Sequence, residues 1–206
     1  MNRTLYNNFI DFEQAFDSAW QDGLWRVMKH CRVLAELVVL IEDIYGKSRS
    51  AVRVERELTD WFLIKVGVRQ GYGMSADLFN LILEIVMRLA ERREEVGVMI
   101  NGTTLNYLRF VDDIDLIADT ETNLQQLTDR VHGSSKRMGM RINTENTKTM
   151  TIGKQHEDIQ IKLGGEVLEQ VTKFVYLGET LKKDGRSTED NKKKNWAGMC
   201  SLWETR

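Results

Sequence analysis

The chain has 206 residues, 42% hydrophobic and 29% charged, and is therefore long enough to bury the core of one domain or slightly more. Its formal net charge of −2 excludes a surface that coats nucleic acid by charge alone, so such binding would need a local basic patch. Two cysteines are too few for a disulfide framework or a zinc site, and no apolar run reaches the roughly 18 residues of a membrane span. We expect a soluble intracellular protein, with no preference between nucleus and cytoplasm and no membrane partner.

The first part of the chain predicts a buried strand and two helices. The run Phe9-Ile10-Asp11-Phe12 is apolar apart from one carboxylate, which is typical of a buried strand. Apolar residues then recur at three- and four-residue steps over residues 20–31, and Asp17 or Ser18 is the expected cap of this helix. The same period predicts a second helix over residues 34–46.

The middle of the chain predicts two short strands, a loop that contains glycines, and the longest helix. The strands are expected at residues 52–54 and 62–66, and the loop at residues 67–74. Ser75 is the expected N-cap of a helix from Ala76 to about Glu94. The broad apolar stripe of this helix is typical of a helix at the centre of a fold.

Two hairpins are predicted next. Asn101-Gly102 favours the positive φ angles of a type I′ turn, so residues 98–105 should form the first hairpin. Two strand-like runs follow at residues 108–111 and 114–118. Because Asp112-Asp113 lies between them, we expect these two acids to form the turn of the second hairpin.

The last third of the chain predicts one more helix, several short strands and a basic end. Thr122 and Gln125 resemble a capping box for a helix that Gly139 closes. From Lys182 to the C-terminus, seven Lys and Arg stand against four Asp and Glu, so this segment is the local basic patch. The short strands are expected at residues 141–143, 148–152, 159–163 and 174–177.

Three acids stand out because each lies inside or at the tip of an otherwise apolar strand: Asp11, Asp112 and Asp113. Buried carboxylates lose hydration and neighbouring ones repel, which favours a divalent cation beside them. Mg²⁺ takes one or two protein carboxylates and completes its shell with water and phosphate oxygens, and paired ions catalyse phosphoryl displacement. Two plainer alternatives stay open, since Asp-Asp is an acceptable turn and a lone Asp can accept backbone hydrogen bonds.

Five motifs follow one another between Phe9 and Gly178, and together they span nearly the whole chain. They are Phe9 to Ser18; Gly67 to Gly71 with Ser75 and Leu78 to Asn80; Phe110 to Ile114; Gly139 to Asn143; and Phe174 to Gly178. In this order they resemble the reverse transcriptase domain of non-LTR, LINE-type retrotransposons. The resemblance implies an α+β fold, namely a polymerase palm whose antiparallel sheet is backed by helices around a ferredoxin-like core. It further implies a palm with partial fingers elements over residues 1–178 and, over residues 179–206, a basic segment that begins a helical thumb.

The resemblance also implies an activity and a metal site. The activity is RNA-directed DNA polymerisation, in which a dNTP is added to the 3′-hydroxyl of a DNA primer on an RNA template. Asp11 and Asp112 would hold two Mg²⁺ ions, with Mn²⁺ as an alternative, and Asp113 would support them. The backbone carbonyl of Phe12 would add a further metal ligand.

Further residues match positions that the family uses for nucleotide and primer. Phe16 falls where the family places an aromatic ring beneath the sugar of the incoming nucleotide, although its pattern alone favours a core phenylalanine beside Trp20. Gln70 and Gly71 fall in the loop that lies against nucleotide and template, and alone would be an ordinary turn. Tyr176, Leu177 and Gly178 fall in the hairpin that grips the primer end, although aromatic residues in an edge strand more often serve packing.

The chain departs from the family pattern at several positions. Gly73 and Ala76 are among the residues that replace a proline-containing stretch, so the loop should be less rigid. Val111 stands where alanine is common, and we expect it to continue its strand. Asn146 stands where the family carries a lysine that is a candidate proton donor, a role that an asparagine cannot fill. Lys148, two residues further along the same side of the strand, is either the substitute for that lysine or the second lysine that the family often has there.

Only ten residues precede Asp11, so we expect the fingers and thumb regions of a longer polyprotein to be missing. The main alternative function is a catalytically inactive or repurposed remnant that binds RNA or a protein partner through the sheet face and the basic segment Lys182 to Lys194. A second alternative is another two-metal enzyme with a palm-like fold, such as a cyclase that uses one nucleotide. The Gln-Gly pair and the primer-grip-like hairpin argue against that second alternative.

Overall fold

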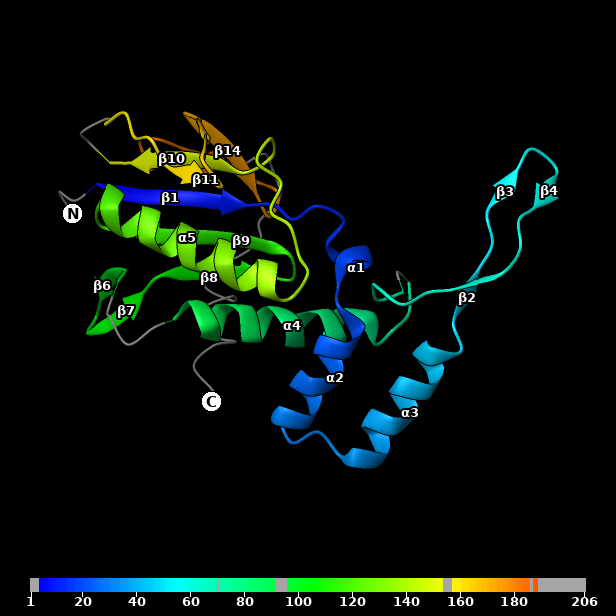
Figure 1. Ribbon diagram of the computed structural model, residues 1–206. Helices are drawn as coiled ribbons and strands as arrows, with labels where there is room; N and C mark the ends of the chain where they lie inside the picture. The colour runs from blue at the N-terminus through cyan, green and yellow to red at the C-terminus, as the bar shows by residue number, and fades with distance from the viewer. Residues whose placement is uncertain (1–3, 70, 92–95, 154–156, 186, 189–206) are drawn as a thin grey trace.

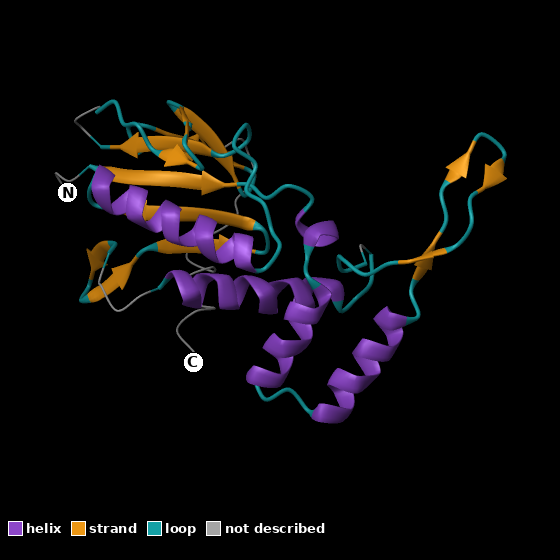
Figure 2. Ribbon diagram, viewed as in Figure 1, coloured by secondary structure: helices purple, strands orange, loops and turns teal. Residues whose placement is uncertain are grey.

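The structure is a computed structural model, and it describes residues 4–69, 71–91, 96–153, 157–185 and 187–188. One sheet and two long helices form the body of the molecule, and a region of short helices and hairpins extends from one end of it (Figure 1). Figure 2 shows the two long helices against the sheet and the shorter helices beyond one end of it. Among the described residues, no helix is both long and apolar enough to cross a bilayer.

The central sheet has five strands in the order β13-β10-β1-β9-β8. Neighbouring strands run antiparallel, except that β13 is parallel to β10 at one edge. The strands are β1 (Leu5–Ile10), β8 (Tyr107–Phe110), β9 (Asp113–Ala118), β10 (Lys148–Ile152) and β13 (Glu169–Gln170). This order brings β1, from the start of the chain, between β9 and β10, which come from its second half.

Two long helices, α4 (Ser75–Ala90) and α5 (Glu121–Arg137), cover one face of the sheet (Figure 1). Asn8 of β1 points to this side, where its amide donates to the Thr128 hydroxyl of α5 at 2.9 Å. Because side chains alternate along a strand, Phe9 faces the opposite side, where it packs with Met150 and Tyr176 in a second, smaller apolar cluster. This second face is covered around β1 and β10, whereas Leu108 and Phe110 of the edge strand β8 stay exposed on it.

The predicted caps of both long helices are wrong. Ser75 is the first residue of α4 rather than its cap, and its hydroxyl donates to the carbonyl of Arg69, which fixes the preceding loop. The cap of α5 is Thr120, whose hydroxyl accepts from the backbone N–H of Asn123 at 3.2 Å, two residues before the predicted Thr122. The helix begins earlier than predicted because β9 already ends at Ala118.

The segment between β1 and α4 contains three helices: α1 (Ala15–Ser18), α2 (Gln21–His30) and α3 (Ala35–Gly46). The prediction that Asp17 or Ser18 caps the first long helix is wrong, because both residues lie inside α1 and the N-cap of α2 is Trp20. The second predicted helix is confirmed by α3.

An extended arm follows α3 and projects away from the body (Figure 1). Its strands are β2 (Arg49–Ser50), β3 (Arg53–Val54), β4 (Glu57–Leu58) and β5 (Phe62–Leu63), with β2 paired to β5 and β3 to β4. The strand predicted at residues 62–66 is thus only two residues long, and Val66 forms an isolated bridge with Trp20 instead.

The Asn-Gly hairpin is confirmed. The strands β6 (Val98–Ile100) and β7 (Thr103–Leu105) are joined by Asn101 at φ 51° and Gly102 at φ 84°, the positive angles that a type I′ turn needs. The turn preference of Asn-Gly alone was therefore enough to predict both turn residues.

The second hairpin differs from its prediction by one residue. Phe110 pairs with Asp113, so the two-residue turn is Val111-Asp112, and Asp113 belongs to β9. Val111 does not continue the strand as expected but adopts φ 55°, an unusual conformation for a β-branched residue. Such backbone strain costs about 1–3 kcal/mol and is tolerated where neighbouring structure enforces it.

The C-terminal part of the described chain adds two small sheets and little regular structure between them. One consists of β11 (Lys162–Leu163) and β12 (Glu166–Val167), shorter than the strand expected at 159–163. The other consists of β14 (Lys173–Tyr176), β15 (Glu179–Lys182) and β16 (Ser187–Thr188). The domain boundary expected after residue 178 therefore falls inside this sheet, and most of the basic segment lies outside the described residues.

Candidate active site

Asp11 and Asp113 meet at one end of the central sheet. Asp11 follows the last residue of β1, and Asp113 is the first residue of β9. The antiparallel register pairs Ile10 with Ile114, so its continuation places Asp11 opposite Asp113. Both acids line one pocket of about 180 Å³, together with Asn146 and an apolar wall. Residues far apart in the sequence thus bring their carboxylates to the same place.

Aromatic side chains form the wall of this pocket that faces the acids. Phe174 and Tyr176 reach it from β14, and the ring of Phe174 stacks on Phe9 of β1 with centroids 4.1 Å apart. The Tyr176 hydroxyl donates to the backbone carbonyl of Asp113 at 3.4 Å, a long hydrogen bond. The β14 hairpin is therefore joined directly to the strand that carries Asp113. In that hairpin, Leu177 (φ 50°) and Gly178 (φ 81°) form the turn that follows Tyr176.

The electrostatic surroundings of Asp113 reflect its acidic neighbours. Its pKa is raised, first by partial burial and then by the negative charges of Asp112 and Asp11. Asp112 itself is exposed in the turn and does not line the pocket. Negative charges gathered in this way make a cation favourable beside Asp113.

The carboxylates of this site suit a divalent cation that keeps other oxygen ligands besides those of the protein. The described residues contain no group of three His, Cys, Asp or Glu side chains arranged to hold a metal ion. Mg²⁺, however, uses one or two protein carboxylates and fills its other positions with water and phosphate oxygens. Asp11 and Asp113 would supply these two carboxylates. Phe12, the candidate carbonyl ligand, follows Asp11 directly; its side chain is buried, and its backbone bridges to Ile142.

Asp11 is held by one loop that runs between α5 and β10. Its backbone N–H donates to the Thr147 hydroxyl at 3.2 Å, and its backbone carbonyl accepts from the N–H of Asn143 at 2.9 Å. Its carboxylate accepts from the side-chain amide of Asn146 at 3.0 Å. Three separate polar groups of Asp11 are therefore fixed by this loop.

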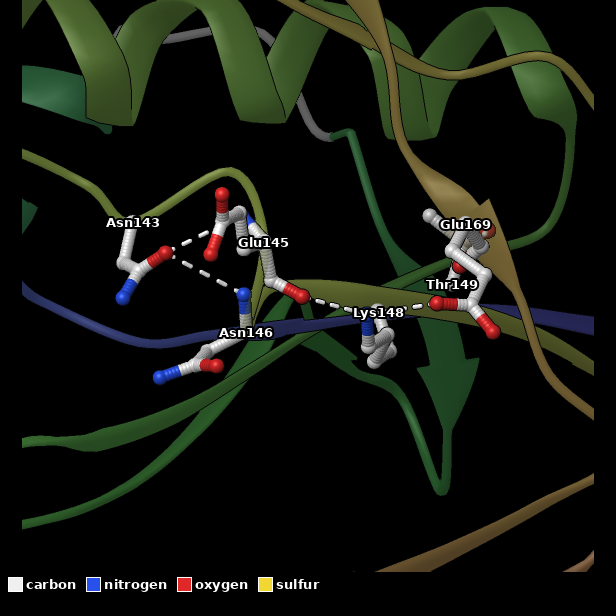
Figure 3. Close-up of polar contacts among 6 residues, drawn as sticks. All are labelled: Asn143, Glu145, Asn146, Lys148, Thr149 and Glu169. Atoms are coloured by element: carbon white, nitrogen blue, oxygen red, sulfur yellow. Dashed lines mark hydrogen bonds and ion pairs between the residues drawn. The ribbon is translucent and has the colours of Figure 1, made fainter.

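Lys148, the candidate proton donor, is engaged elsewhere. Its ammonium group donates to the Glu169 carboxylate at 2.7 Å and to the carbonyl of Glu145 (Figure 3). In the register of the sheet, Lys148 lies opposite Phe9, and Asn146 is the residue that reaches Asp11. The structure thus places Asn146, and not Lys148, beside the acids.

Phe16 lies in α1, next to the start of the glycine-containing loop. Phe16 is half-buried, and its ring stacks on Phe79 of α4 with centroids 4.7 Å apart. Its backbone carbonyl accepts from the N–H of Val68 at 2.7 Å, which anchors the loop. Gly71 is exposed at φ 82°, whereas Gln70 lies outside the described residues.

The sequence analysis missed Asp115, a second acid on the pocket side of β9. It is 3% exposed and accepts a hydrogen bond from the Asn7 amide at 2.8 Å. Burial raises its pKa to about 8, although the Asn7 hydrogen bond acts in the opposite direction. The signal that singled out Asp11, an acid within an apolar strand, also marks Asp115 and could have identified it.

Comparison with protein families gives one match over most of the chain. The family model described as "Reverse transcriptase (RNA-dependent DNA polymerase)" matches residues 3–181. A curated relative from Nasonia vitripennis, the retrovirus-related Pol polyprotein from type-1 retrotransposable element R2, is 25% identical over 77% of this chain and 15% of its own length. The corresponding polyprotein from type-2 retrotransposable element R2DM of Drosophila melanogaster is 25% identical over 73% and 14%. The chain thus spans about a seventh of these relatives.

Solved structures share the fold at lower identity. Apo telomerase from Candida tropicalis, truncated from its C-terminal domain, aligns with TM-score 0.63 and 17% identity over 91% of this chain and 36% of the telomerase chain. Telomerase from the same organism in complex with a TWJ fragment of telomeric RNA aligns with TM-score 0.64 and 15% identity over 95% and 31%. At these identities the likeness establishes a mixed α/β fold of the reverse transcriptase-like polymerases.

Proposed function

The chain belongs to the reverse transcriptase (RNA-dependent DNA polymerase) family, in its non-LTR retrotransposon branch, and from this premise we propose that it is the polymerising palm of a longer protein. Its ferredoxin-like core would be the succession β1-α4-β8-β9-α5-β10, whose strands lie in the order β10-β1-β9-β8. The proposed activity is template-directed transfer of a dNTP to the 3′-hydroxyl of a DNA primer on an RNA template. The observation that carries the proposal is the meeting of Asp11 and Asp113 in one pocket under the β14 hairpin.

The three acids provide the chemistry of this proposal. Asp11, Asp113 and the exposed Asp112 would hold two Mg²⁺ ions, or Mn²⁺ ions, which when bound lower the pKa of the primer 3′-hydroxyl and offset the negative charge of the triphosphate. Asp112 is free to approach a triphosphate from the turn because its side chain is exposed. Phe12 would add its backbone carbonyl from the position next to Asp11.

The remaining residues would position substrates. Phe16 would lie beneath the sugar of the incoming nucleotide and exclude a 2′-hydroxyl, with Gln70 and Gly71 beside nucleotide and template. The turn residues Leu177 and Gly178, with Tyr176, would hold the primer end next to Asp113, which the Tyr176 hydrogen bond to that residue supports. Lys148 stays a candidate proton donor only if its contact with Glu169 opens.

The activity is tested by extension of a DNA primer on an RNA template with the 206-residue chain, with and without Mg²⁺. We expect Mg²⁺-dependent extension that Asp11→Asn and Asp113→Asn each lower by at least a hundredfold while the thermal unfolding transition is retained. Asp158→Asn is the matched control, because it removes the charge of an exposed acid outside the pocket.

Two outcomes contradict the proposal. Extension that persists in Asp11→Asn would remove the metal assignment. An inactive wild-type chain that binds RNA in a salt-dependent manner, equally well in both acid variants, would instead support the RNA-binding remnant, because phosphate contacts alone give that salt dependence.

A further inference from the structure

The loop that holds Asp11 is itself rigidly built. The side-chain oxygen of Asn143 accepts from the backbone N–H groups of Glu145 at 3.0 Å and Asn146 at 3.2 Å (Figure 3). The N–H of Thr147 donates to the backbone carbonyl of Asn143 at 3.0 Å. Lys148 closes the loop from outside by binding the Glu145 carbonyl and the Glu169 carboxylate. The backbone at residue 146 is therefore fixed from three sides.

This rigidity determines where the side chain of Asn146 points. Its amide nitrogen lies 3.0 Å from a carboxylate oxygen of Asp11, and both residues line the pocket that contains Asp113. Like charges on adjacent strands repel, so an unrestrained Asp11 carboxylate would turn away from Asp113. A hydrogen bond from a fixed donor opposes that rotation.

The donor is neutral, which matters at a cation site. A lysine at this position would form an ion pair with Asp11 and compete with a bound cation for the same charge. An amide N–H orients the carboxylate but leaves its charge available. Partners that orient metal ligands in this way commonly change metal affinity by 10–100-fold when removed.

We propose that Asn146 is a positioning residue that fixes the Asp11 carboxylate in the orientation that binds a divalent cation, with Asn143 holding Asn146 in place. The proposal rests on the metal site of the proposed function. It also assigns a purpose to the residue that stands where the family carries a lysine: orientation of an acid rather than proton donation.

The test measures Mn²⁺ binding by the 206-residue chain without nucleotide or nucleic acid, from the electron paramagnetic resonance signal of free Mn²⁺. We expect Asn146→Ala to weaken Mn²⁺ binding about tenfold. Thr144→Ala is the matched control, since Thr144 is a neutral residue of the same turn with no hydrogen bond to Asp11 among the described contacts, and it should bind within twofold of wild type.

The outcomes separate this proposal from the one on which it rests. If Asp11→Asn binds Mn²⁺ as well as the wild-type chain does, both the metal site and the role of Asn146 are overturned. Asp11-dependent binding that Asn146→Ala leaves unchanged would overturn only the role of Asn146, even if the variant melts at a lower temperature. If Asn146→Ala loses its cooperative unfolding transition, Asn146→Ser replaces it, because a serine side chain is shorter and keeps a polar group in the turn.

Discussion

At the scale of single residues, the ionisation of Asp115 is coupled to the stability of the fold. Its carboxyl group is almost completely buried, and its pKa is raised to about 8 in the folded chain, against about 3.9 for an exposed aspartate in the unfolded chain. Between these values the unfolded chain releases a proton that the folded chain retains. The free energy of unfolding should therefore fall as pH rises from about 4 to about 8 and then level off.

Asp115→Asn tests this expectation. The amide has the same shape as the carboxyl group and can still accept the hydrogen bond from Asn7, but it does not titrate. The variant should match wild type near pH 4 and be more stable by a few kcal/mol at pH 8, measured by urea unfolding with EDTA present. A difference between the two proteins that is the same at pH 5 and pH 8 would show that Asp115 does not titrate in this range.

Phe16 carries a prediction about sugar selection. Because its ring is half-buried against Phe79, replacement should cost stability as well as remove the ring proposed to lie beneath the sugar. We expect Phe16→Ala to increase the ratio of kcat/KM for ribonucleotides to that for deoxyribonucleotides by at least tenfold. A ratio is the suitable measure because a loss of folded protein lowers both rates equally.

Phe79→Leu serves as the control for Phe16→Ala. It disturbs the same ring contact from α4 without removing the ring of Phe16. Its ribonucleotide ratio should stay near that of wild type. If Phe16→Ala is active and its ribonucleotide ratio is unchanged, Phe16 serves packing and does not select the sugar.

At the scale of elements, the edge of the sheet formed by β10 and β13 bears on the role of Lys148. Its ion pair with Glu169 joins these two strands, and its contact with the Glu145 carbonyl supports the loop that holds Asp11. If Lys148 acts through this ion pair, Lys148→Gln and Glu169→Gln should lower kcat by similar factors, and the double variant by no more than either. If Lys148 is instead the proton donor, only Lys148→Gln should lower kcat and change its pH profile.

Elements that depend on local sequence were predicted well. The helix α3 and the Asn101-Gly102 hairpin are confirmed because hydrophobic period and turn preference are set by neighbouring residues. Their ends were less predictable. Thr122 has the residue type of a cap, but Thr120 takes the position because β9 ends just before it.

The turn of the second hairpin shows the same dependence on neighbouring strands. Sequence pattern placed Asp112 and Asp113 together in the turn, yet pairing with Phe110 assigns Asp113 to β9 and moves Val111 into a strained conformation. The pairing of β9 with β1 sets this register, because Ile114 must lie opposite Ile10. The shift by one residue is what directs Asp113, and not Asp112, into the pocket.

At the scale of the whole molecule, the acids lie where two layers meet. The helices α4 and α5 cover one face of the sheet, and the β14 hairpin packs on the other through Phe9, Phe174 and Tyr176 (Figure 1). The pocket lies at the end of this second interface. This is the end of the sheet at which β1 leads into α1.

The order of motifs was sufficient to identify the family, because the identities of a few residues at set places survive when most others change; the match over residues 3–181 confirms it. The same motifs identified Asp11, Asp112 and Asp113 as candidate metal-binding acids. The meeting of Asp11 and Asp113 in one pocket required strand pairing between distant parts of the chain, which no local pattern encodes. The contact of Asn146 with Asp11 and the burial of Asp115 likewise arose from that pairing, since hydrogen bonds and loss of hydration depend on which groups the folded chain brings together.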